Sequence, residues 1–186
     1  MSEFSPSSLN IDCEKETEKI SAGIREILKK DLKRRGIVIG LSGGIDSSVT
    51  AALAVRAIGK ERVFGLEMPE LHSSKETPEL SSKLIHHLGI ESERIDISPI
   101  LEAVGFYSNY DSAIKMVIPQ YGKGWKSKIV ISSIFDNKGF SLNSIVAQAP
   151  DGTMHKERLP LKPYLEIVAA TNCKQRTRKM LEYYHA

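Results

Sequence analysis

The sequence predicts an α/β protein with an open parallel sheet and helices on both faces of that sheet. Short β-branched strands alternate with amphipathic helical segments from residue 12 to about residue 105, a rhythm that favours right-handed βαβ units. The first strand, Ile37–Leu41, is almost entirely apolar, as is typical of a central parallel strand covered on both faces. Residues 125–160 depart from this rhythm and have the pattern of an inserted antiparallel β meander.

The N-terminal part of the chain predicts one helix after a loose start. Residues 1–11 are serine-rich and poor in apolar residues, whereas 12–186 have the pattern of a single α/β domain. Asp12 can cap a helix that runs to about Arg35. Its apolar face consists of Ile20, Ile24, Ile27, Leu28 and Leu32. We expect this face to pack on the sheet, and a dimer surface is the alternative.

The alternation continues through two more strands. In order, we expect a helix ending at Gly59, a strand over Arg62–Met68, a helix over about Pro78–Gly89, a strand over Arg94–Ile97 and a helical pattern from Pro99. Gly105 weakens that last pattern. Ligands of such sheets bind at the carboxyl ends of the strands, where Ser42–Ser48 and Met68–Ser74 fall.

The meander and one long helix complete the prediction. Strands are expected over Lys128–Phe135, Phe140–Gln148 and Thr153–Leu159, with turns at 136–139 and 150–152. We expect a packing insertion, and a substrate lid or subunit contact is the alternative. A helix follows over Tyr164–Ala186.

The chain is organised around the run from Gly40 to Ser48, Gly-Leu-Ser-Gly-Gly-Ile-Asp-Ser-Ser. Gly43 and Gly44 let main-chain N–H groups approach a ligand closely. Ser47 or Ser48 can cap the helix that follows. Free N–H groups at the positive end of that helix form an anion site.

The chemistry of the loop indicates phosphate together with a cation. It lacks the lysine of the G-x-x-x-x-G-K-[ST] nucleotide loop. The hydroxyls of Ser42 and Ser47 can donate hydrogen bonds to the anion. Asp46 beside phosphate makes sense only with a hard cation such as Mg²⁺ between them.

Composition excludes several classes of function. A net charge of +3 over 186 residues, without a long basic run, gives no argument for nucleic acid. No apolar stretch is long enough for a membrane span, and no signal-peptide pattern is present. Cys13 and Cys173 form no C-x-x-C pair, so we expect no structural zinc and a reducing cytoplasm.

Three motifs follow one another along the chain. Ser-Gly-Gly-Ile-Asp-Ser is similar to the pyrophosphate-binding loop of the ATP pyrophosphatases, which have the adenine nucleotide alpha-hydrolase-like fold. The second motif is Met68-Pro69 followed by Ser73-Ser74. The third is the N-x-x-x-R-x-R segment Asn172–Arg178 with Tyr183-Tyr184 beyond it. In this order, the three motifs resemble NAD synthetase, and the resemblance extends over nearly the whole chain.

The resemblance implies a set of site residues and a reaction. The implied ATP-binding residues are Gly40, Ser42, Gly43, Gly44, Asp46, Ser47 and Met68, with Asp46 also binding Mg²⁺. Asn172, Arg176 and Tyr183, which share roughly one helix face, would bind deamido-NAD. The implied reaction amidates deamido-NAD through an adenylate and releases AMP and pyrophosphate. Ammonia would arrive free or from a separate glutaminase, and the family suggests a homodimer.

Three departures leave alternatives open. Leu71 stands where many relatives have an arginine that reaches toward adenine, and the meander is outside the family pattern. The family continues with a G-T-x-x-x-E segment beyond the point that matches Ala186, so we expect this chain to cover only part of the enzyme. The alternatives are another adenylating enzyme with this loop, for amidation or sulfur transfer, and an ATP-binding module that is inactive by itself.

Overall fold

The computed structural model describes residues 10–74, 76–131 and 143–186, and they form two compact units. Unit 1 contains the described residues up to Pro69, then Ser73–Asp96 and Leu181–Ala186, whereas unit 2 contains Glu70–His72 and Ile97–Met180. Units defined by contacts differ from domains defined by descent, so the single domain over 12–186 stays a prediction.

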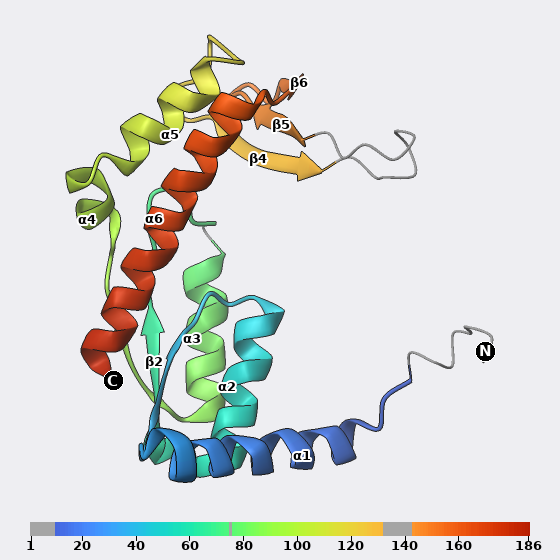
Figure 1. Ribbon diagram of the computed structural model, residues 1–186, viewed down its shortest axis with the longest axis vertical. Helices are drawn as coiled ribbons and strands as arrows, with labels where there is room; N and C mark the ends of the chain where they lie inside the picture. Colours follow the sequence, from blue (N-terminus) through green and yellow to red (C-terminus); the bar gives the residue numbers. More distant parts are fainter. Residues whose placement is uncertain (1–9, 75, 132–142) are drawn as a thin grey trace. The chain divides into compact units, whose positions relative to one another are not determined.

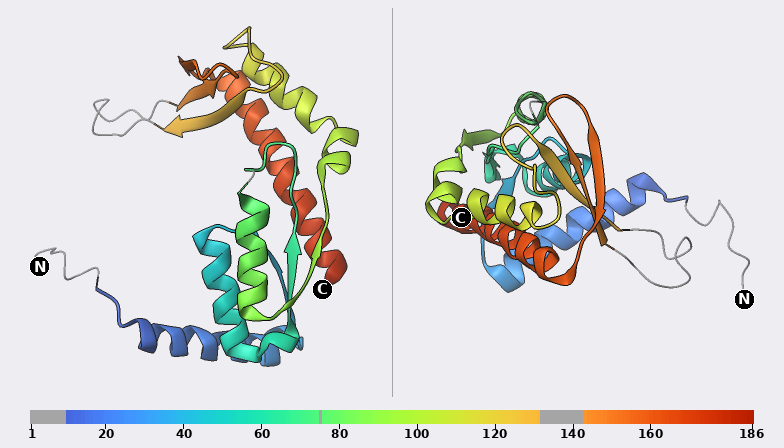
Figure 2. Two further views of the ribbon diagram at one scale, coloured as in Figure 1. Left: turned by 180° about the vertical axis from the view of Figure 1, so that it is seen from behind. Right: turned by 90° about the horizontal axis from the view of Figure 1, so that it is seen from above.

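Unit 1 is built on a parallel sheet with the strand order β1-β2-β3. The strands are β1 (Ile37–Gly40), β2 (Val63–Glu67) and β3 (Glu91–Arg94). α2 (Ile45–Ile58) and the short 3₁₀ helix η3 (Lys60–Arg62) connect β1 to β2, and α3 (Thr77–Leu88) connects β2 to β3. α2 and α3 lie side by side, as Figure 1 and the rear view in Figure 2 show.

Helices cover both faces of this sheet, which confirms the predicted α/β class. One face packs on α2 and α3 through a core of Ile39, Leu41, Ala51, Ala54, Val63 and Ile90. On the other face, the ring of His185 stacks on Phe64, with 5.8 Å between the ring centroids. His185 is the last residue of α6 (Leu161–His185), a helix that contributes to both units.

The predicted third strand is wrong in its position. It was expected over Arg94–Ile97, but β3 spans Glu91–Arg94, and its four residues are all exposed. Backbone pairing with β2 sets its bounds, because Phe64 pairs with Glu91 and Glu67 with Arg94. Within the described residues β3 is an edge strand, so polar side chains suffice, and the apolar pattern that predicted the strand lies beside it.

The N-terminal helix begins where predicted. α1 (Cys13–Glu26) is capped by the Asp12 carboxylate, which accepts a hydrogen bond from the Lys15 N–H (3.1 Å), and it continues as the π-helix η2 (Ile27–Leu32). The helix packs mainly against α2. The expectation that its apolar face packs on the sheet is therefore wrong. Of the five predicted residues only Leu28 is buried.

Unit 2 combines helices with the predicted meander. Its elements are α4 (Ser98–Ala103), α5 (Phe106–Lys115), β4 (Lys126–Ile131), β5 (Asn143–Gln148), β6 (Met154–Arg158) and the part of α6 up to Met180. Gly105, at φ +73°, separates α4 from α5. The strands pair antiparallel in the order β4-β5-β6, which confirms the meander. The predicted turn at 136–139 lies outside the described residues.

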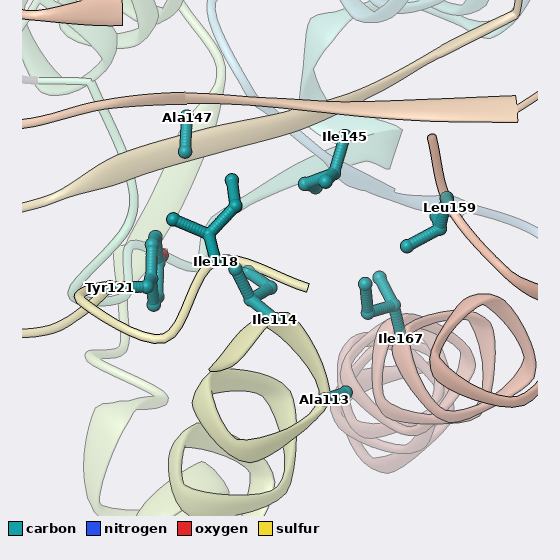
Figure 3. Close-up of a cluster of buried hydrophobic side chains, with 8 residues drawn as sticks. All are labelled: Ala113, Ile114, Ile118, Tyr121, Ile145, Ala147, Leu159 and Ile167. Carbon is teal, nitrogen blue, oxygen red and sulfur yellow. The ribbon is translucent and has the colours of Figure 1, made fainter. Parts of the chain in front are cut away.

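The core of unit 2 joins the meander to the helices. Figure 3 shows the buried side chains converging: Ala113, Ile114, Ile118, Tyr121, Ile145, Ala147, Leu159 and Ile167. They come from α5 and the segment after it, from β5, and from α6 and the residues before it. The meander is thus a packing element of this unit. Among the described residues, no helix has the length and apolar character needed to cross a bilayer.

Candidate functional site

The glycine-rich loop leaves the carboxyl end of β1 and enters α2 directly. Gly43 has φ +69°, a conformation that side chains disfavour. A Cβ atom placed there would lie 2.8 Å from the Leu80 Cβ and 3.1 Å from the Thr77 carbonyl oxygen. Since both belong to the first turns of α3, only glycine fits between the loop and that helix.

Three serine hydroxyls shape the loop. The Ser47 hydroxyl donates to the Gly44 carbonyl (3.1 Å) and accepts from the Ser42 N–H (3.3 Å). It also lies 3.2 Å from the Ser42 hydroxyl, and the Ser48 hydroxyl donates to the Gly44 carbonyl (2.8 Å). The N-cap residue of α2 is Gly44. The expectation that Ser47 or Ser48 caps the helix is wrong, because both lie in its first turn and bond back to the cap residue.

Asp46 stands exposed in the first turn of α2, beside Ser47. The first N–H groups of a helix have no intrahelical acceptor, and the helix dipole favours an anion near them. The loop therefore offers N–H donors, serine hydroxyls and one carboxylate at one place. The described residues contain no group of three His, Cys, Asp or Glu side chains that could hold a metal by themselves. A cation here would need ligand phosphates as well.

Met68 lies at the carboxyl end of β2 and is buried. A Cβ atom on Gly40 would lie 3.1 Å from the Met68 Cε and 2.7 Å from a carboxylate oxygen of Glu182. The structure therefore brings Gly40 and Met68 together behind the loop. Contact of Met68 with a nucleotide stays a prediction.

A buried carboxylate, absent from the sequence prediction, fixes the start of α3. Glu67 accepts hydrogen bonds from the Ser81 hydroxyl and from Arg94 Nη2, the latter at 2.8 Å. Arg94 also donates to the Ser82 hydroxyl (2.9 Å). These contacts join β2, α3 and β3 on the side where Gly43 meets α3. A carboxylate at the end of an otherwise apolar strand was the signal that could have identified Glu67.

The three predicted dinucleotide residues all lie on α6, which is one continuous helix. Asn172 and Arg176 are exposed in unit 2, and Tyr183 is 82% exposed in unit 1. Helical spacing places them within about 40° of one another around the axis. Lys174, on the inner side of the same helix, makes an ion pair with the buried Glu70 (3.2 Å). No local sequence pattern indicates this pair, because 104 residues separate its members.

Comparisons with known proteins agree on one family. The family model described as NAD synthase matches residues 16–120. A curated relative named NH(3)-dependent NAD(+) synthetase, from Rhizobium meliloti (strain 1021), is 49% identical over 183 residues, which cover 98% of this chain and 54% of the relative. A relative with the same name from Rhizobium rhizogenes (strain K84 / ATCC BAA-868) is 46% identical over 185 residues, covering 100% of this chain and 56% of the relative.

A solved structure, the NH3-dependent NAD synthetase from Campylobacter jejuni subsp. jejuni NCTC 11168 in complex with the nitrate ion, aligns with a TM-score of 0.48 and 37% identity. The alignment covers 57% of this chain and 49% of that chain. The chain described here spans about half the length of the curated relatives it matches.

Proposed function

Because the chain belongs to the NAD synthase family, we propose that it functions in the ATP-dependent amidation of deamido-NAD to NAD. The observation that carries the proposal is the loop from Ser42 to Ser47, which lies at the carboxyl end of β1 and inside the matched segment. The names of the Rhizobium relatives support both the product and ammonia as the nitrogen donor.

The proposed reaction has two steps. The nicotinate carboxylate attacks the α-phosphorus of ATP, and the bond to pyrophosphate breaks. Ammonia then attacks the carbonyl carbon of the adenylate, the C–O bond to AMP breaks, and the nitrogen loses a proton. Neither step needs a nucleophile from the protein. Catalysis then comes from positioning and from stabilising the departing pyrophosphate.

The loop residues are assigned to ATP in this proposal. Ser42, Ser47 and the first N–H groups of α2 would hold the pyrophosphate. Asp46 would hold Mg²⁺, which the donor set fits, since Mg²⁺ is commonly bound by one or two carboxylates plus substrate phosphates and water. When bound, the ion neutralises charge on the departing pyrophosphate. Gly40, Gly43, Gly44 and Met68 would shape the nucleotide side of the site.

The exposed face of α6 is assigned to deamido-NAD. The Arg176 guanidinium suits a phosphate or carboxylate, because its planar fork binds two oxygens at once. Asn172 would add a hydrogen bond, and the exposed Tyr183 ring would stack on an aromatic group. We also propose that the protein is a cytoplasmic homodimer, supplied with free ammonia or by a separate glutaminase.

Two substitutions test the site. Asp46→Asn should raise the Kd for Mg·ATP about tenfold or more, because a lost interaction with a charged group costs about 1.5–3 kcal/mol. Arg176→Ala should raise the Kd for deamido-NAD by a similar factor and leave ATP binding unchanged. Isothermal titration of both ligands measures the two effects. Lys162→Ala, at an exposed position of α6, is the control that should change neither Kd. Unchanged curves for both variants would contradict the site assignment.

The reaction itself is tested by mixing the protein, made from its complete reading frame, with Mg·ATP, deamido-NAD and ammonium. NAD and AMP should appear in equal amounts. AMP release that requires a different acceptor would favour another adenylating enzyme. ATP binding without any release of AMP would favour a nucleotide-binding module.

A further inference from the structure

The carboxylate of Glu70 is buried, with its side chain 2% exposed, and three donors surround it. The ammonium of Lys174 lies 3.2 Å from Oε1. The Tyr107 hydroxyl (3.1 Å) and the His72 N–H (2.9 Å) donate to Oε2. Burial by itself would raise the pKa of Glu70, but the His72 N–H and the Lys174 ammonium hold this pKa below its usual value. Glu70 and Lys174 therefore form a true ion pair at neutral pH.

The segment Glu70–His72 directly follows Met68-Pro69, and each of its three residues makes a hydrogen bond or a ring contact within unit 2. The Tyr107 hydroxyl that donates to Glu70 also accepts from the Leu71 N–H (3.3 Å). The His72 ring packs against three aromatic rings of α5, at centroid distances of 5.1–6.0 Å. The Leu71 side chain nevertheless remains 70% exposed. The backbone of the segment is thus held from within unit 2, while its middle side chain faces solvent.

Lys174 anchors the inner side of α6. Its ammonium lies 5.3 Å from the centre of the Phe106 ring, a cation–π contact in addition to the ion pair. The residues two positions away on either side, Asn172 and Arg176, lie about 160° around the helix from it and are exposed. The same contact that fixes Lys174 therefore turns the Asn172–Arg176 face outward.

We infer that the Glu70–Lys174 ion pair is a positioning device that couples the binding of ATP to the binding of the dinucleotide. On one side it holds the segment that continues from Met68, and on the other it holds the helix that carries Asn172 and Arg176. Because the ion pair joins the two segments, a ligand that holds one of them in its binding position also holds the other, so each ligand strengthens the binding of its partner. The inference rests on the proposed function, because that proposal assigns Met68 to the nucleotide side of the site and the exposed face of α6 to deamido-NAD.

The coupling is measured as the ratio of two dissociation constants for deamido-NAD, without and with a saturating ATP analogue that has a methylene group between the α- and β-phosphorus atoms. We expect the analogue to tighten dinucleotide binding about 5-fold or more in the unaltered protein. Glu70→Gln and Lys174→Met should bring the ratio close to one and raise the KM for deamido-NAD more than they lower kcat. Lys174→Arg, which keeps the ion pair, should restore the ratio. Lys162→Met is the control on the same helix.

A double variant keeps the test decisive if a single variant fails to fold, since Glu70→Gln with Lys174→Met leaves no buried charge without its partner. A folded double variant with the full ratio would overturn the inference and leave the ion pair a purely structural contact. An unaltered protein that binds both ligands with a ratio of one would overturn it as well, and the proposed function would stand. An unaltered protein that does not bind deamido-NAD would instead contradict the proposed function.

Discussion

Gly43 and Gly23 show how surroundings decide the effect of the same substitution. Gly43→Ala should destabilise the protein by about 1–2 kcal/mol from the left-handed backbone alone, with a further cost from the contact with Leu80. Gly23 lies within α1, and a Cβ atom there meets nothing within 4 Å. Gly23→Ala should therefore stabilise the protein by about 0.5–1 kcal/mol. Urea unfolding of both variants measures the change in the free energy of unfolding, which should have opposite signs in the two.

The Gly43 variant also tests the loop itself. Displacing the loop from α3 moves the Ser42 and Ser47 hydroxyls. The folded Gly43→Ala variant should therefore bind ATP more weakly than the unaltered protein. Titration of ATP into the folded Gly43→Ala and Gly23→Ala variants makes this comparison. Normal ATP affinity in the Gly43 variant would mean that the loop does not bind the nucleotide.

At the scale of single residues, the sequence was informative where one residue type has a unique property. The loop glycines and serines were identified because few other residues suit a tight turn before a helix. Glu70 and Lys174 escaped notice, because either residue alone is an ordinary charged side chain. Only the folded chain brings them within 3.2 Å and surrounds them with aromatic rings.

Among the elements, strand β5 is the centre of the meander, and its burial gives a matched pair of substitutions. Ile145 on β5 is completely buried, whereas Ile131 at the end of β4 is 67% exposed. Ile145→Ala should destabilise unit 2 by about 2–5 kcal/mol, because it removes buried apolar atoms and leaves a cavity. Ile131→Ala should cost less than about 0.5 kcal/mol. Thermal unfolding followed by Trp125 fluorescence, which reports on unit 2, compares them. Equal losses would contradict the packing role of β5.

The predicted bounds of an element agreed with the structure where its apolar residues are buried. They were wrong where backbone pairing with a neighbouring strand sets the bounds. β2 lies in the core, and the bounds of β1 and β2 agree with their apolar runs. The expected central position of the first strand is wrong, because β2 is the middle strand of the described sheet and only Ile39 of β1 is buried. β3 is polar, and its register with β2 fixes its position, so the nearby isoleucines misled the prediction. α6 begins at Leu161, three residues before the predicted start, because Pro163 is tolerated in the first turn of a helix.

For the whole molecule, the alternation of strands and helices was enough to predict the α/β class, but it could not predict the two units. Glu70–His72 belongs to unit 2, although the residues on both sides belong to unit 1. No local pattern marks this change, since the contacts of these residues come from α5 and α6, far along the chain. The meander, by contrast, was predictable from turn residues and β-branched runs.

Buried and half-buried tyrosines in unit 2 predict a response of this unit to alkaline pH. Burial raises the pKa of Tyr107, Tyr110 and Tyr121 above the ordinary value of 10.0. A pKa that is raised in the folded state adds stability that is complete below the unfolded pKa and is lost as pH rises through the folded pKa. Unit 2 should therefore lose stability from about pH 10 upward.

Trp125 makes this loss measurable, because it is the only tryptophan in the sequence and packs on Tyr121 with 5.7 Å between the ring centroids. When urea unfolding is followed by the fluorescence of Trp125, the urea concentration at the midpoint should decrease as the pH is raised above about 10. Tyr110→Phe should reduce the dependence, since Ser127 keeps a hydrogen-bond contact with Tyr121 and one buried phenol is removed. Tyr183→Phe, at an exposed position, should leave the dependence unchanged. Equal pH dependence in both variants would exclude Tyr110 as a source of the alkaline sensitivity.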